Sequence, residues 1–513
     1  MIFNYFKLAW RNFIKDRLYA VINIVGFTIG MTVCLLIAMY VSDELSYDKF
    51  HKKADRIYRL EVYDSDFNEI ELTVPQLLGP ELKKEFPEVE ATTTLNVYDT
   101  DLQIGEERLK AKIAGVNQDA LSIFSFPLIH GDIETALDEP HEIIVSESFA
   151  KKHFNVSNPI GLETIKNSGN RSEIMKIGGV MKDIPEQSHF HADILYYTAV
   201  KDDKLTFAAY NGFNQYVLLA PNAKPETIIE KFNAKAEEYD YDAEGSDFQL
   251  RPLTNIHLYA NSPDEIEANG SIVYVTTFTI SALLILVLAC INFINLLTAR
   301  SLRRAKEIGI RKTMGAARSQ LANQFFSESF FYVLIAFGFA LLFTQVLLPG
   351  FNNLLNKSLQ LNILYTNVGF LFIGIVLLTG FLSGLYPAWY LSSFRPSFAL
   401  KNAVKGSFLE RQFRNGFVVF QFVISVALIG CTTIIYQQLS YIGSKRLGYE
   451  TENLMLLSGV SFKNVSLDAY RNSIQQIPGV KSVSLANWTP GEMIGNKSSF
   501  QDSTMKKPTI NNI

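Results

Sequence analysis

Long apolar stretches recur along the chain, separated by polar segments of very different lengths. Five of them carry about 20 or more predominantly apolar residues, the length that an α-helix needs to cross the hydrocarbon core of a bilayer. They are residues 19–41, 271–297, 325–348, 368–391 and 417–437. The first is too long for the apolar part of a signal peptide and no small-residue cleavage site follows it, which indicates an uncleaved anchor. The pattern predicts an integral membrane α-helical protein with about five spans.

Residues 42–270, between the first two apolar stretches, alternate short strand-like and helix-like runs. Strands are expected at 56–63, 110–116 and 173–184, and helices at 75–86 and 146–154. Ser146 is placed to cap the second helix, and residues 167–172 have the composition of a hairpin turn. This alternation is typical of an α+β domain. We therefore expect a large α+β domain inserted between spans 1 and 2.

The C-terminal part of the chain resembles the beginning. The run LKKEFPEVEATTTL at 82–95 is similar to SIQQIPGVKSVSLA at 473–486, and a second basic segment with an apolar stretch starts near Arg411. Residues 438–513 are therefore expected to be the start of a second, incomplete domain of the same kind. On this interpretation the chain is a truncated form of a longer duplicated protein. A complete five-span protein is the alternative.

Lys and Arg gather in the segments on one side of the spans. Sixteen of them lie in three segments, residues 1–18, 298–324 and 392–416. The loop at 349–367 holds only Lys357. By the positive-inside rule the three basic segments, and with them the N-terminus, are cytoplasmic. Residues 42–270 and 438–513 then lie on the opposite side of the membrane.

The first 18 residues have a helical pattern of their own. One face would carry Phe3, Phe6, Trp10, Phe13 and Ile14, and another would carry Lys7, Arg11 and Lys15. This arrangement predicts an amphipathic helix that lies on membrane lipid at the cytoplasmic interface. A frayed basic leader is the alternative.

The charges and cysteines restrict the class of protein. Residues 43–270 hold 42 of the 51 Asp and Glu but only 22 of the 47 Lys and Arg. An acidic domain joined to a basic-flanked membrane part does not fit a nucleic-acid binder. Cys34, Cys290 and Cys431 all lie in apolar stretches, so the acidic domain has neither a disulfide framework nor a cysteine zinc site.

Candidate catalytic residues are few. His189 and His191, in SHFHAD, would hold a metal only with distant ligands, and such pairs are more often exposed or involved in packing. Asp183 and Asp193 flank them in a domain rich in acids. The chain has no G-x-S-x-G, no H-E-x-x-H and no G-x-x-x-x-G-K phosphate loop. We therefore expect no enzyme active site, no metal and no cofactor in this chain.

The segment RSLRRAKEIGIRKTMGAARSQ, at 300–320, carries seven bases and one acid directly after an apolar stretch. A topological anchor would need the charges but no particular order. A surface gripped by a cytosolic partner would also need its apolar and small residues. Charge and pattern alone leave both possibilities open.

Several motifs resemble the permease subunits of the MacB/FtsX type of ABC transporter. KEIGIRKTMGA at 306–316 is similar to the family's REIGIRRALGA, and SGLYPAWYLSSFRPSFALK at 383–401 to its AGLYPAxxASRxxPxEALR. SFPLIHGD at 125–132 and VMKDIPEQSHF at 180–190 resemble its periplasmic core. The second round near Arg411 resembles the duplicated, eight-span permeases of Bacteroidota-like sequences. The resemblance covers nearly the whole chain, which departs from it in its short second half.

This resemblance implies a multi-pass protein of the bacterial inner membrane that is not itself an enzyme. Two permease copies, as a homodimer or a pseudo-dimer of halves, would bind separate cytosolic ABC ATPase subunits and transmit their movement to the periplasmic domain. Export, lipoprotein or lipid extraction and cell-envelope control stay open, as does a periplasmic or outer-membrane partner. A membrane-anchored periplasmic sensor or scaffold without an ATPase, and an inert remnant of a broken gene, are the alternatives from other classes.

The resemblance also favours docking as the role of the basic segment. The expected ATPase-docking residues are Lys306, Glu307, Ile308, Gly309, Ile310, Arg311, Lys312 and Gly315. Isoleucines beside glycines suit a groove on the partner, and the bases suit acids there.

Four residues are expected to act within the membrane. Asn292 and Asn295 would hydrogen-bond a neighbouring helix, or else reach interfacial water. Glu328 would pair with Arg311 or Lys312 and so couple docking to span movement. Pro387 would kink the fourth span as a hinge, or only end it.

Overall fold

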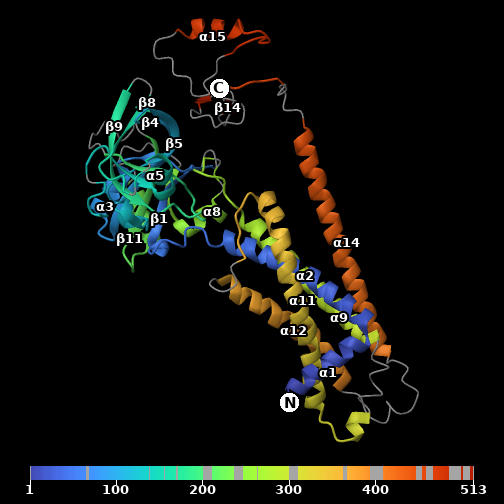
Figure 1. The fold of residues 1–513 in the computed structure, drawn as a ribbon. Helices are drawn as coiled ribbons and strands as arrows, with labels where there is room; N and C mark the ends of the chain where they lie inside the picture. Colours follow the sequence, from blue (N-terminus) through green and yellow to red (C-terminus); the bar gives the residue numbers. More distant parts are fainter. Residues whose placement is uncertain are drawn as a thin grey trace. The chain divides into compact units, whose positions relative to one another are not determined.

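A computed structural model of the chain describes most of its 513 residues (Figure 1). They are residues 2–64, 69–137, 139–154, 156, 158–168, 171–199, 211–235, 246–260, 262, 264–299, 310–361, 367–392, 408–445, 453–457, 466–484, 498–500 and 509–511. The chain divides into two compact units. A helical unit comprises Met1–Ser46 and Gly270–Thr451, and a second unit comprises Tyr47–Asn269 and Glu452–Ile513.

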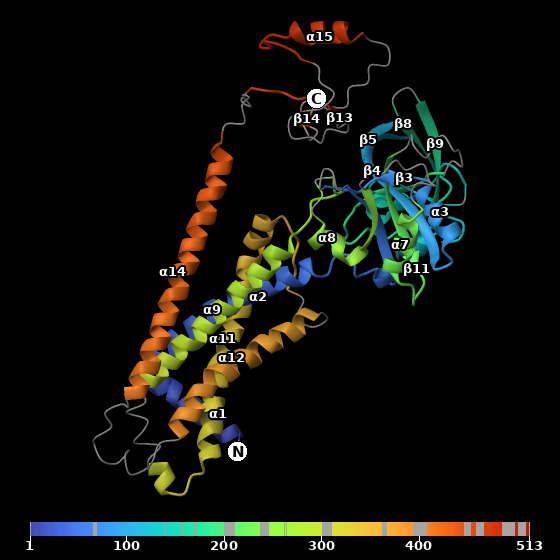
Figure 2. The same ribbon diagram turned by 180° about the vertical axis from the view of Figure 1, so that it is seen from behind.

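The helical unit begins with a short helix, α1 (Ile2–Lys15), which carries the amphipathic pattern of the first residues. Long apolar helices follow, which in chain order are α2 (Arg17–Glu44), α9 (Ile272–Ala299), α11 (Arg318–Leu355), α12 (Asn367–Ser392) and α14 (Phe408–Ser444). Helix α2 packs against both α9 and α11, and α12 packs against α11 and α9 (Figure 2). Rings of α2, α9 and α11 meet in the centre, where Phe27 and Tyr332 each contact Phe293.

Small residues let these helices approach closely. A Cβ added to Gly30 of α2 would lie 3.1 Å from the Ala289 Cβ of α9. On α12, a Cβ at Gly380 or Gly384 would lie within 2.6 Å of a phenylalanine ring carbon of α11. Glycines at helix contacts of this kind are typical of membrane bundles, where close backbone approach replaces the missing hydrophobic driving force.

The expected spans coincide with helices. Within the described residues four helices are long and apolar enough to cross a membrane, at Arg17–Glu44, Ile272–Leu297, Arg318–Leu355 and Asn415–Ser444. The expected fourth span lies in α12, whose apolar part is Gly369–Leu385. Helix α11 continues through Pro349 as far as Leu355, beyond the expected end of the third span. It ends at Asn356, which takes a left-handed conformation with φ of 51°.

The second unit contains a large mixed sheet within Tyr47–Asn269, which we call the sheet domain. Its strands are β1 (Ile57–Asp64), β2 (Glu69–Glu71), β3 (Val74–Pro75), β4 (Val89–Ile104), β5 (Glu107–Val116), β6 (Leu128–His130), β7 (Glu142–Ser146), β8 (Glu163–Ser168), β9 (Arg171–Met181), β10 (Ile194–Tyr197), β11 (Asn211–Leu219) and β12 (Ser246–Pro252). The order along the main path is β12-β1-β11-β4-β5-β10-β7-β9-β6. Pairs β5–β10 and β7–β9 are parallel, and the other pairs are antiparallel.

Short helices accompany this sheet and complete the α+β domain. They are α3 (Leu78–Glu85), α4 (Ala120–Ile123), α5 (Glu147–His153), α7 (Pro225–Asn233) and α8 (Ile256–Tyr259). Helix α3 packs against β4 and β11, and α7 packs against β12. Leucine, isoleucine and phenylalanine side chains fill the space between helices and sheet, with Leu82 of α3 and Phe232 of α7 in one cluster.

The elements expected from the sequence are confirmed with small shifts. The three expected strands are β1, β5 and β9, and the Ser146 side chain caps α5 by accepting the N–H of Phe149. Strands β8 and β9, which flank the centre of the expected turn at 167–172, pair antiparallel with Ser168 opposite Arg171. The helix expected from residue 75 begins only at Leu78, because Val74 and Pro75 pair with β11 as β3.

The C-terminal residues repeat the beginning only in part. Helix α15 (Leu467–Gln475) precedes Pro478 much as α3 precedes Pro87. Residues 480–484, which correspond to the start of β4, form no strand. Strands β13 (Ser498–Phe500) and β14 (Thr509–Asn511) pair antiparallel with each other.

Candidate functional site

The structure describes the basic segment at 298–324 from Ile310 onward, apart from its first two residues. Lys306, Glu307, Ile308 and Gly309 lie outside the described residues. Residues 310–313 are helical, and the Ile310 side chain is 44% exposed. Arg311 and Lys312 are half-buried. An exposed isoleucine beside partly covered bases is available for contact with another protein, but the docking role stays a prediction.

Gly315 has a conformational reason of its own. Its φ is +93°, a left-handed value that favours glycine, and a Cβ there would meet nothing within 4 Å. The Gly315 N–H donates to the carbonyl of Lys312, and the Ala316 N–H to that of Arg311. These two bonds form a Schellman motif that ends the helix. The sequence interpretation considered only the small size of this glycine.

One of the two expected partners of Glu328, Arg311, contacts the helix that carries Glu328. Glu328 is 3% exposed in α11, and the Arg311 guanidinium donates a hydrogen bond of 2.5 Å to Gln324, one turn earlier on the same helix. Arg311 therefore contacts α11 at the side-chain amide of Gln324. Coupling through Glu328 stays a prediction.

Asn292 and Asn295 belong to α9, which packs against α2 and α12. The Asn292 side-chain nitrogen of α9 lies 3.5 Å from the Cβ position of Gly26 on α2. The Asn295 side-chain oxygen is buried, and no described residue donates to it. Position 387 falls inside α12, but the Pro387 side chain lies outside the described residues.

The two histidines of SHFHAD have separate carboxylate partners in the sheet domain. His189 is buried, with Nδ1 2.8 Å from the Asp48 Oδ1 and Nε2 2.8 Å from the Tyr216 hydroxyl. Asp48 is also fully buried and has a left-handed φ of 58°. The Asp48 N–H donates to the carbonyl of Gln187. This histidine therefore joins the first residues of the domain to strand β11.

His191 joins the last residues of the domain to the same loop. Its Nδ1 lies 2.8 Å from the Glu267 Oε2, its Nε2 lies 3.0 Å from the Pro185 carbonyl, and its N–H donates to the Glu267 Oε1. Both ring nitrogens face acceptors, which favours the doubly protonated ring. The hydrogen bond to Glu267 raises the pKa of His191. Burial opposes ionisation of Glu267, but its bond to His191 lowers the pKa of that carboxyl.

A buried ion pair involves Glu265, which lies two residues before Glu267 in the chain. The Arg59 side chain is 0% exposed and binds Glu265 through two hydrogen bonds of 2.7 Å. Glu61 accepts from both Arg59 and Arg251. Burial alone would lower the pKa of Arg59, but the bond to Glu265 together with the interactions with Tyr216, Glu61 and Glu265 raises that pKa. The only sequence signal was a pair of opposite charges two residues apart within an expected strand.

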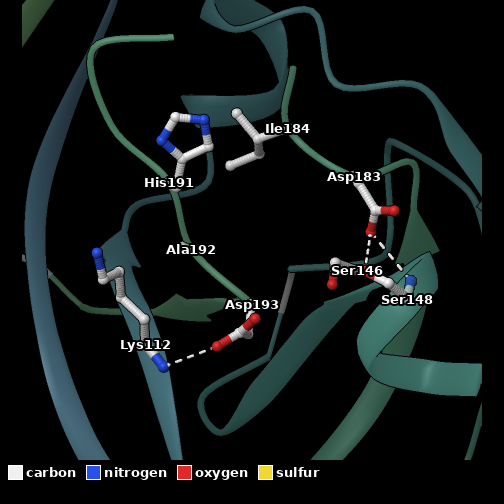
Figure 3. Close-up of a pocket in the computed structure, with 8 residues that line it drawn as sticks. All are labelled: Lys112, Ser146, Ser148, Asp183, Ile184, His191, Ala192 and Asp193. Carbon is white, nitrogen blue, oxygen red and sulfur yellow. Dashed lines mark hydrogen bonds between the residues drawn. The ribbon is translucent and has the colours of Figure 1, made fainter. Parts of the chain in front are cut away.

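A small open cavity of about 260 Å³ lies beside His191, lined in part by Lys112, Ser148, Asp183 and Asp193 (Figure 3). Asp183 accepts from the N–H and hydroxyl of Ser148, and Asp193 accepts from the Lys112 N–H. Each carboxylate thus holds backbone or a hydroxyl in place. Within the described residues no group of three or more His, Cys, Asp or Glu is arranged to hold a metal.

Comparison with known families gives two matches. Residues 20–235 match the MacB-like periplasmic core domain, and residues 279–396 match the FtsX-like permease C-terminal region. The uncharacterized ABC transporter permease YknZ of Bacillus subtilis is 25% identical over 236 residues, which are 45% of this chain and 55% of that protein. The chain thus spans about half the length of this curated relative.

Solved structures match about two fifths of the chain, and two of them cover 39% each. A permease-protein domain from Porphyromonas gingivalis is 20% identical, with a TM-score of 0.35, over 39% of this chain and 91% of its own. The periplasmic region of MacB from Actinobacillus actinomycetemcomitans is 14% identical, with a TM-score of 0.29, over 39% of this chain and 90% of its own. At these values the structures add no functional argument.

Proposed function

This chain carries a MacB-like periplasmic core domain and an FtsX-like permease domain and is related to ABC transporter permeases, and from this premise we propose that it transmits the movement of a cytosolic ATPase to its sheet domain. This movement would serve one of three processes: export, the extraction of lipid or lipoprotein, or control of the cell envelope. ATP is hydrolysed by the separate partner subunit.

The observation that carries this proposal is the place of the two matched regions in one chain. The core-domain match begins in α2 and continues to residue 235 of the sheet domain, and the permease match begins in α9 and continues to residue 396. A large domain is thus inserted between two apolar helices that pack on each other. Movement of either helix reaches the domain through the chain itself.

The segment from Lys306 to Gly315 is the surface of this chain on which the proposed ATPase would dock. Its support is the motif KEIGIRKTMGA and the exposed side chain of Ile310 at the described end of the segment. The Schellman motif at Gly315 stops this short helix just before α11 begins. A push on the segment would therefore reach α11 through only a few residues.

The test is purification of the full chain from native membranes in mild detergent, followed by identification of bound cytosolic proteins. Gly309→Arg keeps the positive charge that an anchor needs but fills the small position that docking needs. Ser301→Arg is the matched control, because it adds the same charge outside the motif. We expect an ABC ATPase to co-purify with the wild type and the control, but not with Gly309→Arg.

Two other results would contradict this proposal. If both arginine variants keep the ATPase, the segment is an anchor and docking takes place elsewhere. If no ATPase binds even the wild type, the sensor or scaffold function without ATPase coupling takes precedence.

A further inference from the structure

We propose that residues 187–191 form a clamp that fixes both chain segments by which the sheet domain is joined to the flanking helices. The clamp would make the domain follow movements of α2 and α9 instead of letting the linkers absorb them. The mechanical role rests on the proposed function, whereas the clamp itself rests on contacts within the sheet domain. We call Asp48, His189, His191 and Glu267 the clamp residues.

The entry side of the clamp holds the chain immediately after α2. Asp48 is fully buried and bonds to this loop through its N–H, which donates to Gln187, and through its carboxylate, which contacts the His189 ring. His189 in turn contacts the Tyr216 hydroxyl of β11. The chain is thereby anchored on a central strand of the sheet. Next to it, the ring of Tyr47 stacks on His257 with centroids 3.4 Å apart.

The exit side holds the chain immediately before α9. The Glu267 carboxylate accepts hydrogen bonds from the backbone N–H and the ring Nδ1 of His191. The Nζ of Lys112, on β5, lies 3.5 Å from the Glu267 Oε1. Two residues earlier, Glu265 is bound by the buried Arg59 of β1. A buried ion pair is weak evidence for a stable fold, because removing two charges from water costs free energy. Such a pair can, however, favour one arrangement of the chain over others. Here the arrangement specified is the path of the exit segment.

The free lengths of chain outside the clamp are short. Helix α2 ends at Glu44 and α9 begins at Ile272. Four peptide steps separate Glu44 from Asp48, and five separate Glu267 from Ile272, which span at most about 14 Å and 18 Å when fully extended. A helix-end displacement that uses up this slack must pull on Asp48 or Glu267. The same five-residue loop binds both, so it receives force from either helix.

The first measurement is hydrogen exchange of the full chain in lipid nanodiscs. Glu267→Ala removes both acceptor oxygens, and we expect exchange of the amides at His191 and at 264–271 to rise on the order of tenfold or more. Glu267→Gln restores an acceptor and should recover part of the protection. Glu81→Ala, which removes an exposed pair with Lys84, is the matched control and should change nothing at these sites. Unchanged protection in Glu267→Ala would overturn the clamp.

The second measurement adds ATP to nanodiscs that carry the co-purified ATPase. In the wild type and in Glu81→Ala we expect ATP to change exchange in the sheet domain, and in Glu267→Ala we expect this response to be lost while ATPase binding and hydrolysis persist. A response that survives in Glu267→Ala would mean that force enters by another route. If no ATPase binds the wild type, the proposed function fails, and the exchange measurement still decides the clamp.

Glu265→Gln provides a second variant on the exit side. It weakens the pair with Arg59 while keeping the size of the side chain, and we expect the same local rise in exchange at 264–271. Slow exchange preserved in β4 and β5 would show that the domain is still folded. Loss of protection throughout the sheet would overturn the part of Glu265 in fixing the exit segment, because it would mean that this residue supports the whole fold.

Discussion

Asp48 holds a backbone conformation that few residues other than glycine adopt. Its φ of 58° is tolerated best by glycine, asparagine and aspartate, because a short polar side chain can bond locally. In this protein the carboxylate accepts from both the backbone and the ring of His189. A residue chosen for its conformation thus also supplies the acceptor that a buried histidine needs.

We predict that Asp48→Ala lowers the free energy of unfolding of the sheet domain by about 2–4 kcal/mol. About 1–2 kcal/mol comes from the left-handed conformation, and the rest from the unpaired His189. Asp48→Asn should cost less, because asparagine tolerates this φ and still offers an acceptor. The measurement is exchange of the slowest amides of β11 in the full chain. Equal losses in the two variants would contradict the argument.

We predict that the stability of the sheet domain depends on pH through the buried side chain of His51. Burial lowers the pKa of this histidine to about 4, and its Nδ1 accepts the N–H of Ser125. The unfolded chain takes up a proton near pH 6.5 while the folded chain does not until about pH 4. Stability therefore falls as the pH drops through this window, by up to about 3 kcal/mol.

The measurement is the melting temperature of the full chain in detergent between pH 4 and pH 7. His51→Asn, which keeps an acceptor for Ser125 but cannot be protonated, should flatten the acid side of the profile. His191 acts in the opposite direction. Its pKa is raised, so its contribution is fully present below pH 6.5 and is lost as the pH rises through the raised value.

At the scale of elements, the helix end at Gly315 is determined by backbone geometry rather than by space. We predict that Gly315→Ala weakens this end by about 1–2 kcal/mol, because the φ of +93° is unfavourable for alanine although a Cβ would meet nothing. Gly338→Ala in α11 is the matched control. A Cβ there also meets nothing, and alanine favours a helix by up to about 1 kcal/mol.

The measurement is hydrogen exchange at Gly315 and Ala316, whose amides make the two closing bonds. We expect faster exchange in the Gly315 variant and no change there in the control. Unchanged exchange in the Gly315 variant would mean that the chain beyond Ala316, and not this glycine, stops the helix.

At the scale of the whole molecule, the distribution of Lys and Arg predicts which side of the membrane each segment occupies. We expect a cysteine introduced at Glu106, in the exposed turn between β4 and β5, to react with a membrane-impermeant maleimide in intact cells. A cysteine at Ser301 should react only after the membrane is opened. Both would be introduced after Cys431, which is exposed, is replaced by serine. Reaction of the Ser301 cysteine in intact cells would reverse the topology.

Much of the architecture was predictable from periodicity. Apolar stretches of span length became α2, α9, α11, α12 and α14, since a helix in lipid must be apolar on nearly every side. The strands β1, β5 and β9 followed from alternation and composition, and Ser146 capped α5 as expected. Boundaries were less predictable. Pairing with β11 delayed the start of α3, and α11 passed through Pro349.

Features of this protein that depend on neighbouring residues could be predicted from the sequence, whereas contacts between residues far apart in the chain could not. The sequence by itself determined the long apolar helices, the inserted α+β domain and the order of the residues in KEIGIRKTMGA, because these depend on residues near one another in the chain. Only the tertiary structure decided the roles of His189 and His191. Their carboxylate partners, Asp48 and Glu267, are 141 and 76 residues away, and no local pattern encodes a contact that exists only once the sheet has formed.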